Sequence, residues 1–221
     1  MEENKPPSPE QLAQQLRMPA GELGTAVGIS MNKSNLHLYD LVIPKMDLKN
    51  SDRILEIGFA NGNFLEDLYK AAPGIHITGL DYSKDMVDEA TAKNQQRIND
   101  GKLDLLVGNS DSIPFPDSTF DKVLCVNVIY FWDQPTDHLI EVNRVLKPGG
   151  EFYSCFRTRT AMSTFPFTKF GFILYEELEW RKILTDNNFT QIQTTQGFQS
   201  IEWDGKKVDL ETLCMVGRKR N

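Results

Sequence analysis

The chain has 221 residues, of which 40% are hydrophobic and 25% charged, so it has the composition of a folded protein with a large core. Its 24 Lys and Arg residues against 31 Asp and Glu residues give a net charge of -7, which disfavours non-specific binding to nucleic acids. No apolar run approaches the ~18 residues of a membrane span, and the proline-rich start does not resemble a secretory signal. We therefore expect a cytoplasmic protein without a nucleic-acid or membrane partner.

The cysteines and histidines give no sign of a metal site. Cys125, Cys155 and Cys214 lie far apart in apolar, strand-like runs, and no Cys or His pair has the spacing of metal ligands. We expect three buried free thiols and no bound metal.

The first 50 residues predict interrupted helix. Residues 11–17 and 35–43 have helical periodicity, and we expect the segment from Pro19 to Gly21, together with Gly24, to break the chain between them. This region precedes a more regular pattern and is expected to form an N-terminal helical extension.

From residue 53 onward, strands and helices alternate at spacings typical of βαβ units. Right-handed crossovers then place helices on both faces of a mainly parallel sheet. The last two strands have only residues 197–209 between them, which predicts a hairpin and one antiparallel strand. The expected strands are 53–57, 75–80, 103–107, 120–128, 151–156, 189–195 and 211–216, and the expected helices are 63–71, 84–98, 137–146 and 176–187. We expect an α/β fold with seven strands, the last of them antiparallel, over residues 51–221.

Ligands of open parallel sheets bind beyond the carboxyl ends of the strands. The first strand is followed by Gly58 and Gly62, which allow a tight turn into a helix N-terminus but lack the G-x-G-x-x-G spacing of dinucleotide sites. The second strand ends at Asp81, which suits either the two ribose hydroxyls of an adenosine or the cap of the next helix. Asn109 and Ser110 follow the third strand and suit either an adenine edge or a polar turn.

Taken together, five segments resemble the class I S-adenosylmethionine-dependent methyltransferases in order and spacing. One departure is Ala60, which stands where the family's first motif has its middle glycine, and another is Asn109, where many relatives carry Asp. The segments are residues 55–62, 79–86, 108–115, 120–124 and 141–150.

The resemblance implies a Rossmann-like fold and S-adenosylmethionine as cofactor, with S-adenosylhomocysteine as product. It also implies a role for each matching residue around the cofactor. These are Glu56, Gly58, Ala60 and Gly62 for the methionine portion, Asp81 for the ribose, Tyr82 and Met86 beside the adenine, Asn109 and Ser110 at the adenine edge, and Asn127 near the amino-acid end.

The implied activity is in-line transfer of a methyl group, which needs an oriented acceptor and in some cases a base. His37, Tyr39 and Tyr130 are candidate bases, with His138 as a further one, although no motif identifies any of them. For each of them the sequence favours a packed or solvated role over that of a base.

Two segments are expected to form the acceptor pocket. The N-terminal helices resemble a lid, with Met31, Asn32, Tyr39 and Asp40 facing the site, and the aromatic stretch Phe165 to Phe172 suits a substrate wall or simple packing. An aromatic pocket predicts a small-molecule acceptor. The alternatives are a methyltransferase of macromolecules, a non-catalytic module that binds S-adenosylmethionine or S-adenosylhomocysteine, and a nicotinamide-dependent oxidoreductase, which the missing glycine motif disfavours. Either a monomer or a homodimer is compatible with the sequence.

Overall fold

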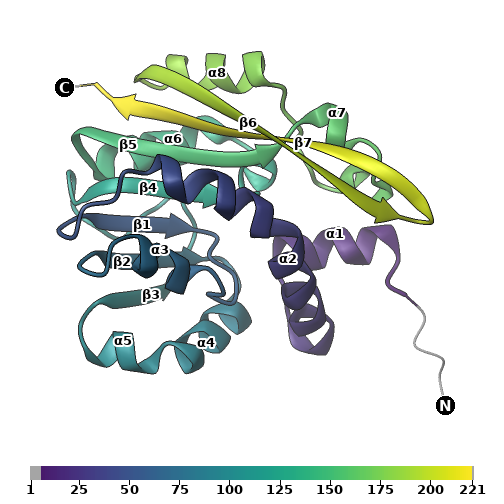
Figure 1. Ribbon diagram of the computed structural model, residues 1–221, viewed down its shortest axis with the longest axis horizontal. Coiled ribbons are helices and arrows are strands. Elements are labelled where there is room, and N and C mark those ends of the chain that lie inside the picture. The colour runs from purple at the N-terminus through teal and green to yellow at the C-terminus, as the bar shows by residue number, and fades with distance from the viewer. Residues whose placement is uncertain (1–5, 221) are drawn as a thin grey trace.

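The computed structural model describes residues 6–220, which fold around one seven-stranded sheet (Figure 1). The strand order is β3-β2-β1-β4-β5-β7-β6, and β7 runs antiparallel to both of its neighbours. The predicted fold class is therefore confirmed, including the single antiparallel strand. The strands are β1 (Arg53–Ile57), β2 (His76–Asp81), β3 (Leu103–Val107), β4 (Phe120–Val126), β5 (Leu146–Arg157), β6 (Phe189–Trp203) and β7 (Lys206–Lys219).

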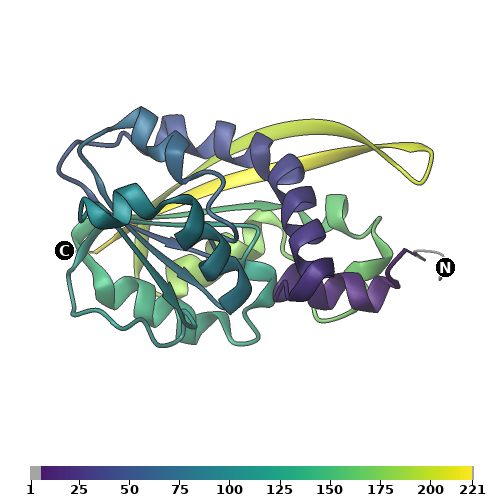
Figure 2. The same ribbon diagram turned by 90° about the horizontal axis from the view of Figure 1, so that it is seen from below.

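Helices cover both faces of the sheet, which explains why its parallel strands are apolar on both sides (Figures 1 and 2). Leu55 and Val123 pack in one cluster with α6 and α8, whereas Ile54 and Leu124 pack in a second cluster with α2 and α3. No helix within residues 6–220 has the length and apolar character needed to cross a membrane. The helices are α1 (Pro9–Arg17), α2 (Gly21–Val42), α3 (Leu65–Ala71), α4 (Lys84–Lys93), α5 (Gln95–Asn99), α6 (Pro135–Val145), α7 (Arg159–Met162) and α8 (Glu177–Asp186), with short 3-10 turns η1 (Ile43–Lys45), η2 (Ile129–Phe131) and η3 (Pro166–Lys169).

The N-terminal region differs from the sequence prediction, because α2 is one continuous helix of 22 residues. Gly24 does not break it. A Cβ on Gly24 would lie 2.7 Å from the carbonyl carbon of Pro19, so the glycine instead lets the α1–α2 turn approach the helix closely. The segment from Pro19 to Gly21 does separate the two helices, as expected.

The C-terminal hairpin is much longer than predicted. Residues 197–209 were expected to be a loop, but they continue β6 and β7 to a two-residue turn at Asp204 and Gly205. Both turn residues have positive φ, 50° and 68°, which matches the tight hairpin turn that an Asp-Gly pair favours. The hairpin therefore extends beyond the rest of the sheet (Figure 2).

Several other element boundaries differ from the prediction; for example, β5 begins at Leu146 instead of residue 151. The helix expected over 84–98 is divided at Asn94 into α4 and α5, and the side chain of Asn94 donates to the carbonyl of Ala90 at 2.8 Å. The fourth strand ends at Val126 because Asn127 takes a positive φ of 56°. Both residues are asparagines: Asn127 adopts a positive φ that asparagine tolerates, and the side chain of Asn94 competes for a backbone hydrogen bond.

The three cysteines lie buried as free thiols in adjacent strands, as predicted. Cys155 of β5 is in register with Cys214 of β7 and contacts the N-terminal region, where its Sγ lies 3.6 Å from the carbonyl oxygen of Leu38. Cys155 and Cys214 belong to the packing between α2 and the sheet, whereas Cys125 packs on the opposite face with α6 and α8.

Candidate active site at the carboxyl ends of the parallel strands

A cavity of about 370 Å³ opens where the parallel strands end, a size typical of small-ligand sites. The structure brings most of the predicted cofactor residues together in its wall, whereas Glu56 and Gly62 lie outside the wall. The predicted residues that line the cavity are Gly58, Ala60, Asp81, Tyr82, Met86, Asn109, Ser110 and Asn127.

The turn after β1 is held in a conformation that side chains normally avoid. Gly58 has a φ of 74°, and a Cβ there would lie only 2.3 Å from Cγ2 of Val128. Ala60 also has a positive φ, 50°, although it carries a Cβ. Its N–H donates to Oδ2 of Asp81 at 2.8 Å. This hydrogen bond helps an alanine keep the backbone conformation that glycine adopts more easily.

Asp81 connects the ends of β1 and β2 from a buried position. Its Oδ1 accepts a hydrogen bond from the N–H of Ser83 at 2.8 Å, while its Oδ2 accepts the one from Ala60. Burial raises the pKa of Asp81, and the two backbone hydrogen bonds oppose that shift. Each carboxylate oxygen keeps a further lone pair, so the group can still accept hydrogen bonds from a ligand hydroxyl.

Glu56 is buried beneath the same turn, and its Oε1 accepts a hydrogen bond from the hydroxyl of Tyr39 at 2.5 Å. Its Oε2 has no partner within residues 6–220. Burial raises the pKa of Glu56 to about 7, with a further upward contribution from Asp81, although the Tyr39 hydrogen bond lowers it. The turn after β1 thus covers a buried carboxyl group, one oxygen of which has no partner among the described residues.

Gly62 does not line the cavity but packs between α3 and α4. Its φ is 70°, and a Cβ there would lie 3.0 Å from both Cβ of Ala90 and Cδ1 of Leu65. The glycine therefore allows the start of α3 to lie against α4. In that way it positions the loop that carries Gly58 and Ala60.

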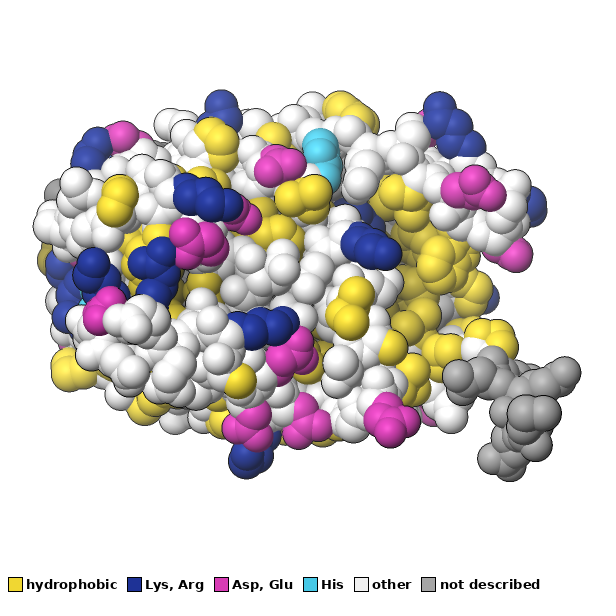
Figure 3. Space-filling model, turned by 60° about the horizontal axis from the view of Figure 1, so that its bottom comes forward, with side chains coloured by type: hydrophobic (Ala, Val, Ile, Leu, Met, Phe, Trp, Pro, Cys, Tyr) yellow, Lys and Arg dark blue, Asp and Glu magenta, His cyan; other side chains and the backbone are white. Residues whose placement is uncertain are grey.

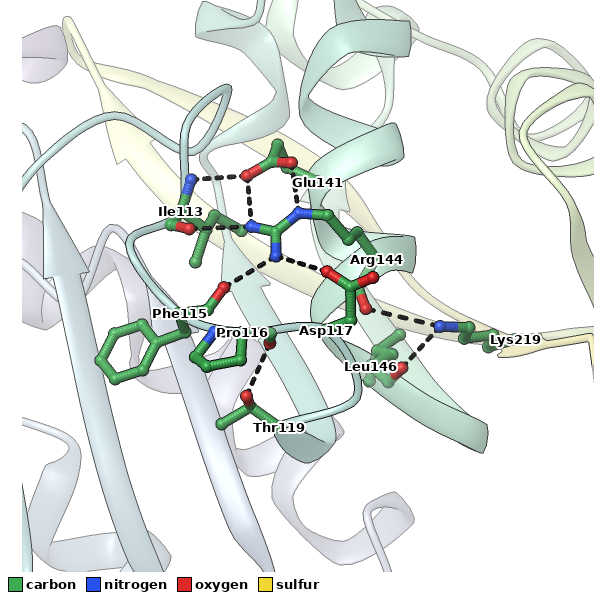
Figure 4. A network of polar contacts seen from close by, with 9 residues as sticks. All are labelled: Ile113, Phe115, Pro116, Asp117, Thr119, Glu141, Arg144, Leu146 and Lys219. Atoms are coloured by element: carbon green, nitrogen blue, oxygen red, sulfur yellow. Dashed lines mark hydrogen bonds and ion pairs between the residues drawn. The ribbon is translucent and has the colours of Figure 1, made fainter.

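The loop after β3 is fixed by a polar network that the matching segment 141–150 supplies (Figure 4). Glu141 accepts from the N–H of Ile113 at 2.8 Å, and Arg144 donates to the carbonyls of Ile113 and Phe115 at 2.9 and 2.7 Å. The two side chains also form an ion pair at 2.6 Å. The loop that presents Asn109 and Ser110 is thereby anchored to α6.

Aromatic side chains form the other half of the cavity wall. Phe131 and Phe172 meet edge to face with centroids 4.8 Å apart, and Trp132 stacks on His138 at 4.8 Å. Phe167 also lines the cavity and stacks on Phe165. The stretch from Phe165 to Phe172 therefore contributes both to the wall and to packing. A hollow lined with hydrophobic side chains is visible near the hairpin end (Figure 3).

Of the three candidate bases, Tyr130 alone lines the cavity. Its hydroxyl accepts from the N–H of Arg157 at 2.5 Å and lies 2.9 Å from the carbonyl of the same residue, to which it donates. Tyr39 is bonded to Glu56, and His37 lies against Gly197 of the hairpin, where an added Cβ would be 2.8 Å from its Nε2. His138 also lines the cavity, with its Nδ1 2.8 Å from Oγ of Ser110.

The N-terminal helices contribute to the cavity through residues other than most of those expected. Met31 lines it, but Asn32, Tyr39 and Asp40 do not. Asn35 lines it instead and accepts from Nδ2 of Asn127 at 2.9 Å. Helical periodicity could have predicted Asn35, because Met31 and Asn35 lie four residues apart on one face of α2.

Sequence reasoning also missed Arg157, the last residue of β5, which is only 6% exposed and lines the cavity. Only its position could have indicated it, because Arg157 ends the fifth strand at the same edge of the sheet as the ligand-binding loops. No motif marks it.

A methyltransferase domain family matches residues 55–154. An uncharacterized methyltransferase of Bacillus subtilis, YdaC, is 27% identical over 194 residues, which span 87% of this chain and 97% of that relative. Fatty-acid O-methyltransferase of Mycolicibacterium smegmatis is 29% identical over 157 residues, 71% of this chain and 50% of the relative.

Among solved structures, the putative methyltransferase in complex with the Trm112 methyltransferase activator of Haloferax volcanii has the same fold, with a TM-score of 0.76. It is 22% identical, and the match covers 90% of this chain and 96% of that one. The family match, the relatives and the strand-end cavity agree with the five sequence segments. The chain belongs to the class I S-adenosylmethionine-dependent methyltransferases.

Proposed function

We propose that this methyltransferase transfers the methyl group of S-adenosylmethionine to a small, largely apolar molecule. The observation that carries the proposal is the division of one cavity into two unlike halves. One half consists of polar loops after β1, β2 and β3, whereas aromatic side chains such as Phe131 and Phe172 form the other. A polar donor and an apolar acceptor would each meet matching surroundings.

The polar half fits the donor in several respects. Asp81 would accept from the ribose hydroxyls, and Asn109 and Ser110 would meet the adenine edge beside Tyr82 and Met86. Glu56 lies outside the cavity wall, so it would support the turn that carries Gly58 and Ala60 beside the methionine portion. When bound, S-adenosylmethionine supplies a methyl group made electrophilic by the adjacent sulfonium.

The protein's own contribution would be orientation and exclusion of water, which can lower a barrier by ~7–11 kcal/mol without a dedicated base. Tyr130 would hold the end of β5 through both of its bonds to Arg157, and we assign neither it, His37 nor Tyr39 the role of base. The described part of the N-terminal extension, residues 6–50, would form a lid, since Leu16 and Met31 lie in the cavity wall; the first five residues of the expected extension lie outside the described residues.

The relative from Mycolicibacterium smegmatis, named for a fatty-acid acceptor, favours an apolar molecule over a protein or RNA. Incubation with methyl-labelled donor and separate small-molecule, protein and RNA pools tests this choice. Label is expected in the organic-extractable fraction. Label found only in protein or RNA would overturn the acceptor class.

Calorimetric titration tests the donor site. S-adenosylmethionine and S-adenosylhomocysteine are expected to bind, and NAD is not. Asp81→Asn should weaken S-adenosylhomocysteine binding at least tenfold, because a neutral amide cannot accept at both positions. Asp88→Asn is the matched control, an exposed carboxylate on α4 whose ion pair with Lys84 lies at the surface. Unchanged binding in Asp81→Asn would refute the assignment of the ribose site.

A further inference from the structure

Arg157 is a buried cation without a carboxylate partner among the described residues. Its side chain makes no ion pair within residues 6–220. Nη2 donates to the carbonyl of Ser34 at 2.8 Å and to Oε1 of Gln199 at 3.1 Å, both of which are neutral acceptors. Nε is enclosed without a partner. Nη1 donates to no described residue, so it is the group that a ligand in the cavity can reach.

A buried guanidinium is unfavourable unless a negative charge accompanies it. The effect is visible in its pKa, which burial lowers, with Tyr130 and Cys155 opposing that shift. By contrast, Arg17, another arginine in the cavity wall, is paired with Asp133 at 3.0 Å. Arg157 is therefore a positive charge in the cavity wall that still lacks its anion.

Arg157 lies far from the ribose end of the donor site, although Asn127, assigned to the donor's amino-acid end, follows the neighbouring strand β4. Asp81 ends β2 and Arg157 ends β5, and the strand order places three strand spacings of about 4.8 Å, roughly 14 Å in all, between these ends. The guanidinium also turns toward Ser34 of α2 and Gln199 of β6, on the hairpin side of the cavity. Tyr130, which is bonded to the backbone of Arg157, and Phe172, which packs against Tyr130, belong to the aromatic half of the cavity wall.

We propose that Arg157 recognises an anionic group on the acceptor, so that the acceptor is an apolar molecule carrying a carboxylate. The carboxylate would accept from Nη1, and the apolar body would lie along Phe167 and Phe172. This inference rests on the proposed function, because it assigns the acceptor to the aromatic half of the cavity. It adds a specificity residue that no methyltransferase motif marks.

Binding of matched probes tests the proposal without knowledge of the natural acceptor. Protein saturated with S-adenosylhomocysteine is titrated with decanoate, with the neutral decanamide and with decylamine. The carboxylate is expected to bind at least tenfold more tightly than the amide, and decylamine least tightly. Equal affinities, or no binding by any probe, would overturn the proposal. Failure of S-adenosylhomocysteine to bind would instead refute the proposed function.

Variants then assign the preference to Arg157. Arg157→Gln should reduce the decanoate-to-decanamide preference to below twofold, and Arg157→Lys should retain part of it. Arg159→Gln is the matched control, since it removes the same charge from an exposed ion pair with Glu179. If Arg157→Gln instead weakened S-adenosylhomocysteine binding tenfold and left the probe preference intact, Arg157 would belong to the donor's carboxylate. The comparison of the three probes on wild-type protein tests the preference for a carboxylate even if a variant folds poorly.

Discussion

The backbone N–H of Ala60 donates to the carboxylate of Asp81 at 2.8 Å, which ties the positive-φ turn after β1 to the end of β2. One buried side chain thus has two functions. It stabilises an unfavourable backbone conformation in the adjacent loop, and it offers further acceptor capacity to the cavity. The departure from the family's glycine at this position is tolerated because the hydrogen bond offsets part of its conformational cost.

Ala60→Gly is expected to stabilise the protein by about 0.5–1 kcal/mol. An L-residue in the left-handed region costs roughly 1–2 kcal/mol, of which the greater flexibility of unfolded glycine cancels a part. Urea denaturation measures the change. Ala92→Gly, in an exposed position on α4, is the control and should destabilise by about 1 kcal/mol. Destabilisation of both variants would show that Ala60 is not strained.

Gly58→Ala is expected to destabilise by at least about 2 kcal/mol and to abolish S-adenosylhomocysteine binding. The new Cβ would meet Cγ2 of Val128 at 2.3 Å in addition to the strain of positive φ. Gly101→Ala has a similar φ, 66°, but no atom within 4 Å, so it measures the strain alone. Denaturation and calorimetry compare the two.

The steric part of that effect can be tested separately. The double variant Gly58→Ala with Val128→Ala should recover part of the lost stability, because it removes the clashing methyl group. If it recovers none, the clash with Val128 is not the cause.

The sequence predicted the parallel core well because strands covered on both faces are short apolar runs separated by helices, as in β1 and β4. It did not predict the outer half of the hairpin. There, residues such as Gln199, Ser200 and Lys207 belong to strand segments that leave the core, so no apolar pattern distinguishes them from a polar loop. Tertiary pairing with the neighbouring strand decides their conformation.

The candidate site was predictable where a backbone requirement selects the residue, as at Gly58 and Asp81. Arg157 could not be found in this way. A lone arginine after a strand is ordinary in sequence, and its meaning depends on burial and on the absence of an acidic neighbour among the described residues. Tyr39 shows the reverse case, because an aromatic residue expected at the cavity is instead bonded to Glu56.

The free energy of unfolding is expected to fall as pH rises from about 4.5 to 7. Burial raises the pKa of Glu56 to about 7, above its ordinary value of 4.5, so in this window the folded state binds a proton that the unfolded state has lost. The contribution is present at low pH and is lost by pH 7, with a magnitude on the order of 3 kcal/mol.

Urea denaturation between pH 5 and pH 8 measures this dependence. Glu56→Gln should remove most of it, leaving a smaller slope of the same sign from Asp81, whose pKa burial also raises. Glu66→Gln, an exposed carboxylate, should retain the wild-type profile. If the free energy of unfolding of wild type and of Glu56→Gln changed with pH in the same way, Glu56 would not be the source of the pH dependence.

Tyr39→Phe is expected to destabilise the protein more at pH 8 than at pH 5. The hydroxyl donates to a carboxylate that is charged at the higher pH, where its loss should cost about 1.5–3 kcal/mol, against about 0.5–1.5 kcal/mol when the carboxyl is protonated. Tyr69→Phe is the control, because Tyr69 donates to the neutral carbonyl of Lys102 and its effect should not change with pH. A destabilisation by Tyr39→Phe that does not change with pH would show that the Glu56 carboxyl does not change its charge between pH 5 and pH 8.

The strand order β5-β7-β6 has a consequence for folding of the chain during translation. Translation releases β6 before β7, yet β6 has no partner in the sheet until β7 is inserted between it and β5. The growing chain therefore carries two unpaired strand edges, one on β5 and one on β6, until the hairpin turn at Gly205 and the following strand emerge. Because Gln199 of β6 contacts Arg157, the surroundings of Arg157 in the cavity wall are completed only after β7 has joined β6 to the sheet.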